Sequence, residues 1–467
     1  MNGIRERLIK LKSIDDFLKL LNEMVKEEMG DSYHPYTIQQ LSFYANTNSV
    51  PTDKRYYTFE IPKKKKGEFR KISSPVQQLK NIQYFIKEML EELYIPKDCV
   101  MGFVKKKSVV DNAKKHLNKY YVQNLDIKDF FPSITQDMIF RCLTNEPYFI
   151  DFNVAFMIAR LCCIRKDDES KVLPQGSPTS PILANMVCSR LDDMMMRLAR
   201  QFHLDYTRYA DDMTFSGQYN SFKDGGRFMD LLTSIVERNG FKINTDKKRI
   251  QKHGSRQEVT GIIISSKANV RRKYIKEIRS MLHNWDSSGY AKANKRFAEC
   301  YQRGRRKNDT VIPDLKNVID GKLEYLKMVK GQGDVTYLKL KDRFERLVSQ
   351  SETKVLRTWS WRDFEKDNGV KLDIKVSPVS KEKFIVFPNE SKSQRYFLPL
   401  SLDVSDLDTL QIESTCTVEI TSNPQLKKYN AFISGIARQN ATRLPAGLSA
   451  TALHGAALAP FAAVKPL

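Results

Sequence analysis

The chain has 467 residues and a formal net charge of +23, from 78 Lys and Arg against 55 Asp and Glu. So large a basic excess indicates a polyanionic partner, most often nucleic acid, and a hydrophobic content of 41% argues against a largely disordered chain. No apolar run approaches the roughly 20 residues needed to span a bilayer, and the polar start lacks the apolar core of a secretion signal, so we expect a cytoplasmic protein. The seven cysteines show no paired C-x-x-C spacing and indicate buried, reduced thiols rather than a zinc site.

Residues 1–50 are expected to form a helical extension, because apolar residues recur at helical spacing from Leu8 to Leu21 and Ser13 can cap a helix start. Pro51 ends this region. The aromatic alternation of Tyr56–Ile61 predicts a strand, the basic segment Lys63–Gly67 a hairpin tip, and Phe69–Ile72 the returning strand.

The middle of the chain alternates between helices and strands. A helix is expected over residues 76–95, followed by the basic loop Gly102–Ser108 and a helical segment that contains Asn112 and His116. Tyr120–Asp126 reads as a buried strand, residues 136–165 as helical, and the apolar stretch after Pro181 as a long helix. A strand–turn–strand follows at Tyr206–Ser216, then a helix over 226–238 and a strand over 240–244.

The chain changes character after Val270. Arg271–Arg279 predicts a basic amphipathic helix, Arg303–Lys307 a basic linker, and Leu315–Val329 and Tyr337–Val348 two further helices. Residues 351–440 contain short strand patterns and are expected to form a small β-rich appendage. Residues 441–467 are Ala-rich and contain no acidic residue; one interpretation is a non-native tail, and no function is inferred from it.

Three carboxylates stand at the ends of expected strands. Asp211 and Asp212 break the β-prone run Tyr206–Ser216 at its centre, and Asp126 ends the strand upstream. Carboxylates brought together at neighbouring strand ends can hold two hard cations about 3.5–4 Å apart, the arrangement used for in-line phosphoryl transfer. The residues therefore predict a two-metal site.

Five motifs occur in the order typical of one enzyme family. Asp126–Ile134, Leu173–Pro181 and Tyr209–Asp212 resemble motifs of reverse transcriptases, and Asn112–His116 and Val259–Gly261 resemble the Asn-Ala-x-x-His and Val-Thr-Gly motifs of the bacterial retron-type enzymes. The resemblance covers roughly residues 70–347.

The resemblance implies an α+β, right-hand polymerase. Together with the sequence patterns, it divides the chain into the helical extension 1–50, fingers 51–110, a split-βαβ palm 111–265 with fingers elements interleaved, a helical thumb 266–350, the β-rich extension 351–440 and the tail 441–467. The extension 351–440 departs from the family's minimal form.

The resemblance also implies roles for individual residues. Asp126, Asp211 and Asp212 would be the catalytic ligands of two Mg²⁺ ions, helped by the backbone carbonyl of Ile127. Phe131 would lie under the incoming sugar and favour dNTP over rNTP, although a core position is its alternative. The other expected nucleotide-binding residues are Arg70, Lys71, Gln175 and Lys247.

A dedicated RNA partner is the most specific implication of the resemblance. The expected RNA-binding residues are Asn112, His116, Val259, Thr260, Gly261, Arg271, Arg272 and Lys273. The implied activity is that of an RNA-directed DNA polymerase, a nucleotidyltransferase that copies a structured non-coding RNA into a linked single-stranded DNA in anti-phage defence, with an effector or toxin protein as a further partner.

Two alternatives stay open. One is another bacterial reverse transcriptase, such as a group II intron or unassigned defence enzyme. The other is a scaffold that holds RNA or RNA–DNA to restrain a toxin, against which the three intact carboxylates argue.

Overall fold

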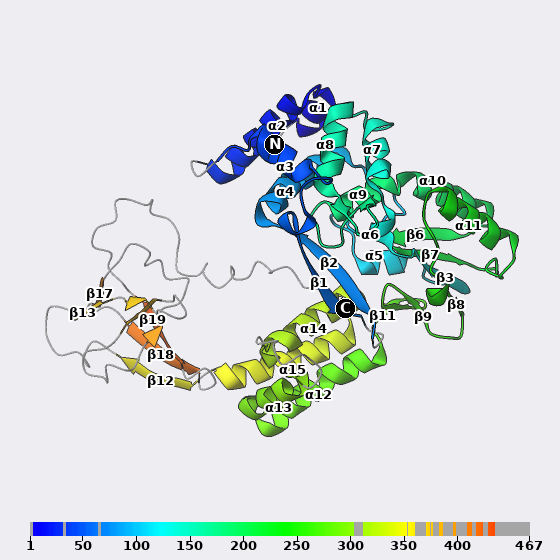
Figure 1. Cartoon of the computed structure of the whole chain (residues 1–467). Helices are drawn as coiled ribbons and strands as arrows, with labels where there is room; N and C mark the ends of the chain where they lie inside the picture. The colour runs from blue at the N-terminus through cyan, green and yellow to red at the C-terminus, as the bar shows by residue number, and fades with distance from the viewer. Residues whose placement is uncertain are drawn as a thin grey trace. The chain divides into compact units, whose positions relative to one another are not determined.

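The protein divides into two compact units, Met1–Arg271 and Arg272–Leu467 (Figure 1). The structure is a computed structural model that describes residues 3–30, 34–63, 67–302 and 312–352, and the strands between 354 and 434. Three features expected from the sequence lie outside the described residues: most of the basic tip at 63–67, the linker Arg303–Lys307 and the tail 441–467.

The first unit begins with the expected helices, α1 (Ile4–Lys10), α2 (Ile14–Met29) and α3 (Ile38–Ala45). Ser13 caps α2, because its hydroxyl accepts a hydrogen bond from the backbone N–H of Asp16 at 3.1 Å. Thr37 and Gln40 form a capping box at the start of α3.

The predicted β-hairpin is confirmed as β1 (Tyr56–Pro62) and β2 (Phe69–Pro75), which pair antiparallel after the short turn η2 (Thr52–Lys54). The expected helix follows as α4 (Gln77–Leu93), and α5 (Val109–Lys114) carries Asn112. A capping box between Ser108 and Asp111 fixes the start of α5.

A four-stranded antiparallel sheet forms the centre of the unit, with strand order β6-β7-β3-β8. Its strands are β3 (Tyr121–Asp126), β6 (Asp205–Tyr209), β7 (Asp212–Gly217) and β8 (Arg249–Lys252). The helices α10 (Ser189–Gln201) and α11 (Arg227–Arg238) pack against each other, and α10 contacts β6. Tyr206 and Phe215 stack beneath this layer and join it to the core.

The helical prediction over 136–165 is wrong in its middle. The segment forms two helices, α7 (Gln136–Thr144) and α8 (Phe152–Cys162), followed by the short strands β4 (Ile164–Arg165) and β5 (Lys171–Val172). Pro147 explains the break, because it has no N–H to donate and restricts the residue before it. Asp151 then starts α8 by accepting hydrogen bonds from the backbone N–H groups of Asn153 and Val154.

Two further predictions need correction. The apolar stretch after Pro181 bends at Cys188 and forms α9 (Ser180–Val187) and α10 rather than one helix. The strand expected over 240–244 is reduced to a single bridge between Ile127 and Ile243, because the chain turns into η3 (Thr245–Lys247) immediately afterwards.

A small sheet ends the first unit, with order β11-β10-β9. Its strands are β9 (Gln257–Val259), β10 (Ile262–Ile264) and β11 (Ala268–Asn269). Because β11 pairs with β10, the first unit continues to Arg271 and does not end at the expected boundary of 265.

The described residues 272–302 and 312–352 of the second unit are largely helical, in agreement with the helical thumb expected from the sequence. Their helices are α12 (Arg272–Ser288), α13 (Tyr290–Gln302), α14 (Leu315–Lys330) and α15 (Val335–Glu352). Ile278, Leu282 and Trp285 lie one helical turn apart on the buried face of α12, and the Trp285 ring meets Phe344 of α15.

Strands follow α15, as predicted for the appendage. One sheet has the order β12-β18-β19-β16-β15-β14 and a second pairs β13 with β17. The strands are β12 (Lys354–Trp359), β13 (Val370–Asp373), β14 (Lys375–Val376), β15 (Lys383–Ile385), β16 (Tyr396–Phe397), β17 (Thr409–Ile412), β18 (Thr417–Asn423) and β19 (Lys428–Ser434). Across the described part of the chain, no helix has both the length and the apolar character that crossing a bilayer requires.

Candidate active site

The three carboxylates predicted from the sequence meet at one edge of the central sheet. Asp126, the last residue of β3, stands directly opposite Asp212, the first residue of β7. Asp211 occupies the turn just before, where its carbonyl oxygen accepts a hydrogen bond from the N–H of Ile127 at 3.1 Å. Residues that are about 85 positions apart in the chain are thereby brought together by antiparallel pairing.

The turn that carries Asp211 is tight and strained. Tyr209 pairs with Asp212, so only Ala210 and Asp211 connect β6 to β7, and Ala210 has a φ of 56°. A left-handed φ at a residue other than glycine costs about 1 kcal/mol or more and needs support from its surroundings. Gly102 supplies part of that support, because a Cβ there would lie 2.6 Å from the backbone nitrogen of Ala210.

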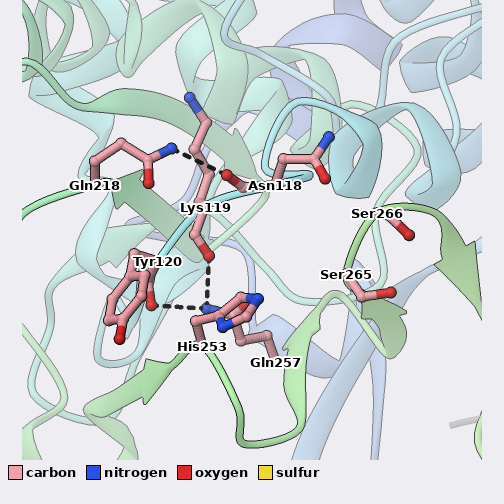
Figure 2. Close-up of a pocket in the computed structure, with 8 residues that line it drawn as sticks. All are labelled: Asn118, Lys119, Tyr120, Gln218, His253, Gln257, Ser265 and Ser266. Carbon is pink, nitrogen blue, oxygen red and sulfur yellow. Dashed lines mark hydrogen bonds between the residues drawn. The ribbon is translucent and has the colours of Figure 1, made fainter.

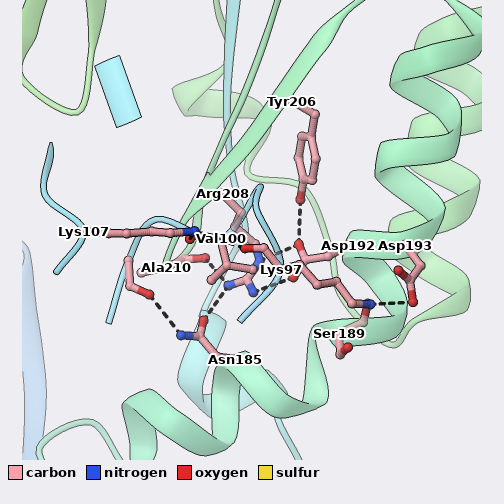
Figure 3. Close-up of polar contacts among 11 residues, drawn as sticks. Lys97, Val100, Lys107, Asn185, Ser189, Asp192, Asp193, Tyr206, Arg208 and Ala210 are labelled. Atoms are coloured by element: carbon pink, nitrogen blue, oxygen red, sulfur yellow. Dashed lines mark hydrogen bonds and ion pairs between the residues drawn. The ribbon is translucent and has the colours of Figure 1, made fainter. Parts of the chain in front are cut away.

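A buried ion pair between Arg208 and Asp192 contacts the backbone of the β6–β7 turn (Figure 3). Arg208 and Asp192 are both fully buried, and the guanidinium donates to both carboxylate oxygens, at 2.8 and 2.7 Å. The guanidinium also donates to the carbonyl oxygen of Ala210 at 3.2 Å and to the side chain of Asn185 at 3.1 Å. Asn185 in turn donates to the carbonyl oxygen of Gly102. One network therefore fixes the turn and the backbone packed on it.

A lysine lies on the carboxylate of Asp126. The ammonium of Lys247 donates to both oxygens of Asp126 at 3.0 Å, and the amide of Asn244 donates to one of them at 3.0 Å. Lys248, the next residue along the chain, pairs with Asp224 instead. The structure therefore distinguishes the two lysines.

The proximity of the carboxylates is reflected in the direction of the pKa shifts of Asp211 and Lys247. Burial raises the pKa of Asp211, and the neighbouring charge of Asp126 raises it further. Burial acts to lower the pKa of Lys247, but its hydrogen bonds and charge interactions with Asp126 outweigh that and raise the pKa. The edge thus concentrates negative charge and holds a cationic group against it.

The side chains at this edge fit divalent cations that prefer oxygen ligands. They are carboxylates, and the repulsion between their negative charges is relieved when a cation binds. Within the described residues no group of three or more His, Cys, Asp or Glu side chains is already arranged around a metal position. The Lys247 ammonium donates to both carboxylate oxygens of Asp126. A cation that binds through these oxygens would therefore displace the ammonium from Asp126.

The expected nucleotide-binding residues lie in four separate segments of the first unit. Phe131 lies half-buried at the start of α6 (Phe130–Ser133), against the rings of Phe103 and Phe130. Phe130 is buried and stacks on Phe241, so Phe130 is the core residue of the pair. Phe131 stays the candidate for sugar selection.

The Pro-Gln-Gly segment packs on the hairpin strand that carries Arg70 and Lys71. The carbonyl oxygen of Gln175 accepts from the N–H of Ser73 at 2.8 Å, and a Cβ at Gly176 would lie 2.9 Å from the side chain of Ile72. Arg70 and Lys71 are consecutive in β2 and face opposite sides, as expected. Lys71 lies 4.0 Å from the exposed carboxylate of Asp167.

The Asn-Ala-x-x-His segment forms a buried chain of hydrogen bonds behind the β6–β7 hairpin. The two ring nitrogens of His116 lie 2.7 Å from the hydroxyls of Ser216 and Thr207, and the Thr207 hydroxyl donates to the Asn112 side chain at 2.5 Å. Because Thr207 uses its proton on Asn112, it must accept from His116 Nε2–H. Burial lowers the pKa of His116 and keeps the ring neutral, so Nε2 carries the proton and Nδ1 accepts from Ser216.

The hydrogen-bond chain continues into the Val-Thr-Gly turn. Asn112 donates to the hydroxyl of Thr260 at 3.3 Å, and Thr260 donates to the carbonyl oxygen of Val109 at 3.3 Å. Thr260 and Gly261 form the two-residue turn between β9 and β10, with φ values of 46° and 85°. Both residues have positive φ, as in a type I′ turn, and the side-chain bonds hold the β-branched Thr260 in that conformation.

The expected RNA-binding residues therefore differ in exposure. The side chains of Asn112, His116 and Val259 are fully buried, so the prediction of direct RNA contact by these three does not agree with the structure. The hydrogen-bond partners of Asn112 and His116 lie on β6, β7 and the β9–β10 turn, so both side chains face the interior. Gly261 and Arg271 are exposed, and Arg271 pairs with Glu258. Arg272 and Lys273 are exposed at the start of α12.

Several supporting residues were not anticipated. Asn244, Asn185, Asp192 and Arg208 hold the catalytic edge through contacts between distant parts of the chain. One signal was present in the sequence. Arg208 is a permanent charge inside an apolar strand, and a buried charge requires a partner. The identity of that partner could not be read from the sequence.

The comparisons with known proteins agree with this geometry. The family model described as "Reverse transcriptase (RNA-dependent DNA polymerase)" matches residues 61–266. The chain is 34% identical over 234 residues to the retron Ec86 reverse transcriptase of Escherichia coli, covering 50% of this chain and 70% of that protein.

Two further matches are a second retron enzyme and a solved structure. The retron Mx65 reverse transcriptase of Myxococcus xanthus is 33% identical over 246 residues, covering 49% of this chain and 56% of that protein, so the chain spans little more than half of this relative. Among solved structures, telomerase from Candida albicans in complex with the TWJ fragment of telomeric RNA shows 10% identity and a TM-score of 0.37, covering 72% of this chain and 68% of that one.

Proposed function

The chain belongs to the retron reverse transcriptases, a family of RNA-directed DNA polymerases, and from this premise we propose that it copies one cognate structured non-coding RNA into a linked single-stranded DNA. The observation that supports this most strongly is the shared edge of Asp126, Asp211 and Asp212. A scaffold that only held RNA would have no use for a strained turn that presents carboxylates.

We propose that two Mg²⁺ ions bind at Asp126, Asp211 and Asp212, with the carbonyl oxygen of Ile127 as a further ligand. When bound, such ions lower the pKa of a primer hydroxyl and stabilise the charge on a leaving pyrophosphate. The buried Arg208–Asp192 pair holds the turn in place during this chemistry, because it binds the carbonyl oxygen of Ala210.

The substrate side of the proposal uses dNTPs. Lys247 would leave Asp126 and meet the pyrophosphate, since its ammonium reaches the carboxylate edge from an exposed position. Arg70, Lys71 and Gln175 would meet the triphosphate and sugar, and Phe131 would exclude a 2′-hydroxyl.

The cognate RNA, the linked DNA product and the biological setting are the parts of the proposal that rest on family resemblance. We propose that the RNA–DNA product serves in anti-phage defence and that an effector protein is a further partner.

The experiment is primer extension by the purified full chain on an RNA template with Mg²⁺. Asp126→Asn, Asp211→Asn and the double variant Asp211→Asn with Asp212→Asn should each abolish synthesis, because an amide keeps the shape but removes a hard anionic ligand. Asp137→Asn, which changes an exposed carboxylate paired with Arg141 on α7, is the matched control and should retain activity. Normal extension by the double variant would overturn the polymerase assignment and leave the RNA scaffold as the alternative.

A further inference from the structure

A pocket of about 400 Å³ lies at the ends of the central strands that point away from the carboxylates (Figure 2). Tyr121, the first residue of β3, pairs with Gly217 at the end of β7 and with Lys252 at the end of β8. Asp126 ends the same strand on the other side, roughly 17 Å away at the usual rise per residue. We call this the strand-end pocket; it is separate from the candidate active site.

An aromatic platform forms one side of the strand-end pocket. The rings of Tyr120 and His253 stack with centroids 5.4 Å apart and planes 20° apart, and the N–H of His253 donates to the carbonyl oxygen of Tyr120 at 2.6 Å. Tyr120 is 48% exposed. A large flat ring that is held in place and half open to solvent is suited to stacking with another flat group.

Polar groups form the rest of the strand-end pocket. The side-chain amide of Gln218 donates to the carbonyl oxygen of Asn118 at 3.0 Å, and the buried Gln257 donates to the carbonyl oxygens of Lys119 and Tyr120 at 3.0 and 3.2 Å. These bonds fix the wall behind the platform. Ser265 and Ser266 line the side across from Tyr120 in Figure 2 and bring hydroxyls to the rim.

The segments around the strand-end pocket carry an excess of positive charge. Residues 114–120, 252–257 and 265–267 contain Lys114, Lys115, Lys119, Lys252, Arg256 and Lys267, and no Asp or Glu. All of these basic residues except Lys119 are exposed; Lys119 pairs with Asp205 of β6, and Arg256 lies 3.8 Å from the carboxylate of Glu258. These basic residues attract phosphate groups to the pocket, and its aromatic platform is suited to stacking with a flat ring.

We propose that the strand-end pocket binds one unpaired nucleotide of an RNA, with its base on the Tyr120–His253 platform and its flanking phosphates at the basic rim. The volume lies within the roughly 300–1,000 Å³ that small-ligand sites occupy. Sequence-specific RNA recognition acts mostly on unpaired bases that stack on aromatic side chains, whereas a protein partner would favour a less charged surface. The proposal rests on the proposed function, because it gives that enzyme a second contact with its RNA.

The test compares two RNA hairpins that share one helix. The first is closed by a loop of unpaired adenosines, and the second by a flexible linker without bases. Binding of the full chain is measured by fluorescence anisotropy. Wild type should prefer the looped hairpin, and Tyr120→Ala should weaken only that complex, by about tenfold, the loss expected when one base loses its stacking partner. Tyr120→Phe keeps the ring and should bind like wild type.

Two further variants separate this site from general effects. Tyr219→Ala removes an 80% exposed ring next to Gln218 that does not line the pocket, and it should change neither complex. Ser266→Tyr fills the pocket without removing the platform and should reproduce the selective loss. Equal losses on both hairpins, or no loss in Tyr120→Ala and Ser266→Tyr, would overturn the proposal.

The proposed function is read separately from binding, by extension of an oligo(dT) primer on poly(rA) with the wild-type protein. Absence of extension would contradict the polymerase but leave the hairpin comparison valid, because the anisotropy measurement needs no catalysis.

Discussion

The histidine of the Asn-Ala-x-x-His segment was expected from the sequence to bind RNA, but in the fold it holds the β6–β7 hairpin. His116 is buried against β6 and β7, and both ring nitrogens bond to hydroxyls of the hairpin that presents Asp211 and Asp212. Burial lowers the pKa of His116 to about 3. Its influence on RNA copying would therefore be exerted through the position of the hairpin.

That pKa gives a prediction about stability. A folded-state pKa below the ordinary value of 6.5 means that protonation favours the unfolded chain. The contribution of neutral His116 is complete above pH 6.5 and is lost as the pH falls toward 3. Between pH 6.5 and 5 the wild type should lose roughly 2 kcal/mol more in the free energy of opening β6 and β7 than His116→Gln, measured by hydrogen exchange. Parallel pH profiles would show that His116 does not titrate in this way.

Replacing Phe131 should change the selection between dNTP and rNTP. Phe131→Ala removes a half-buried ring that packs against Phe103 and Phe130. If this ring lies under the incoming sugar as proposed, the change should open room for a 2′-hydroxyl and raise incorporation of rNTP relative to dNTP. The ratio is measured by primer extension with competing nucleotides. Phe130→Leu alters the buried neighbour, so it should lower stability and leave the ratio unchanged. An unchanged ratio in an active Phe131→Ala enzyme would make Phe131 a core residue.

At the scale of elements, the β6–β7 hairpin depends on one buried charge pair. Asp192→Asn leaves Arg208 buried without its counter-charge, which should cost about 3–5 kcal/mol of unfolding free energy. Asp193→Asn, one position along α10, removes a partly exposed pair with Lys97 and should cost at most about 1 kcal/mol. Urea unfolding of both variants checks this. Similar costs for the two would show that the turn does not rely on Arg208.

The elements themselves show where sequence reasoning succeeds and where it stops. Strands such as β1, β2 and β3 were predictable because aromatic and β-branched alternation is a local property. Hydrogen bonds across long separations were not: His116 and Ser216 are 100 residues apart. The break between α7 and α8 had a visible signal in Pro147, but the apolar pattern on both sides hid it. The carboxylates of the site could be predicted, whereas Arg208 and Asn244, which hold it, could not.

At the scale of the whole molecule, the charge of +23 is distributed over both units. In the first unit, basic residues surround the strand-end pocket and the hairpin β1–β2. In the second, Arg272, Lys276 and Arg279 lie one helical turn apart on α12, on a different face from the buried Ile278, Leu282 and Trp285. Basic residues at regular spacing on a helix face can bind successive phosphates of one structured RNA. The basic segment Lys63–Lys66 is expected to bind any polyanion without specificity.

The last prediction follows from this difference. Replacing Arg272, Lys276 and Arg279 with Gln should weaken binding of the RNA encoded beside the gene more than binding of an unrelated hairpin. It should also reduce the slope of log K against log salt concentration by about 2–3, since each lost phosphate contact removes roughly 0.7–0.9. Replacing Lys292, Lys295 and Arg296 of α13 with Gln removes the same charge, so it should weaken both RNAs alike. Neutralising Lys63–Lys66 should also weaken both. The measurements are binding titrations at several salt concentrations. Equal affinity of the wild type for the two RNAs would rule out a dedicated RNA and favour a general reverse transcriptase.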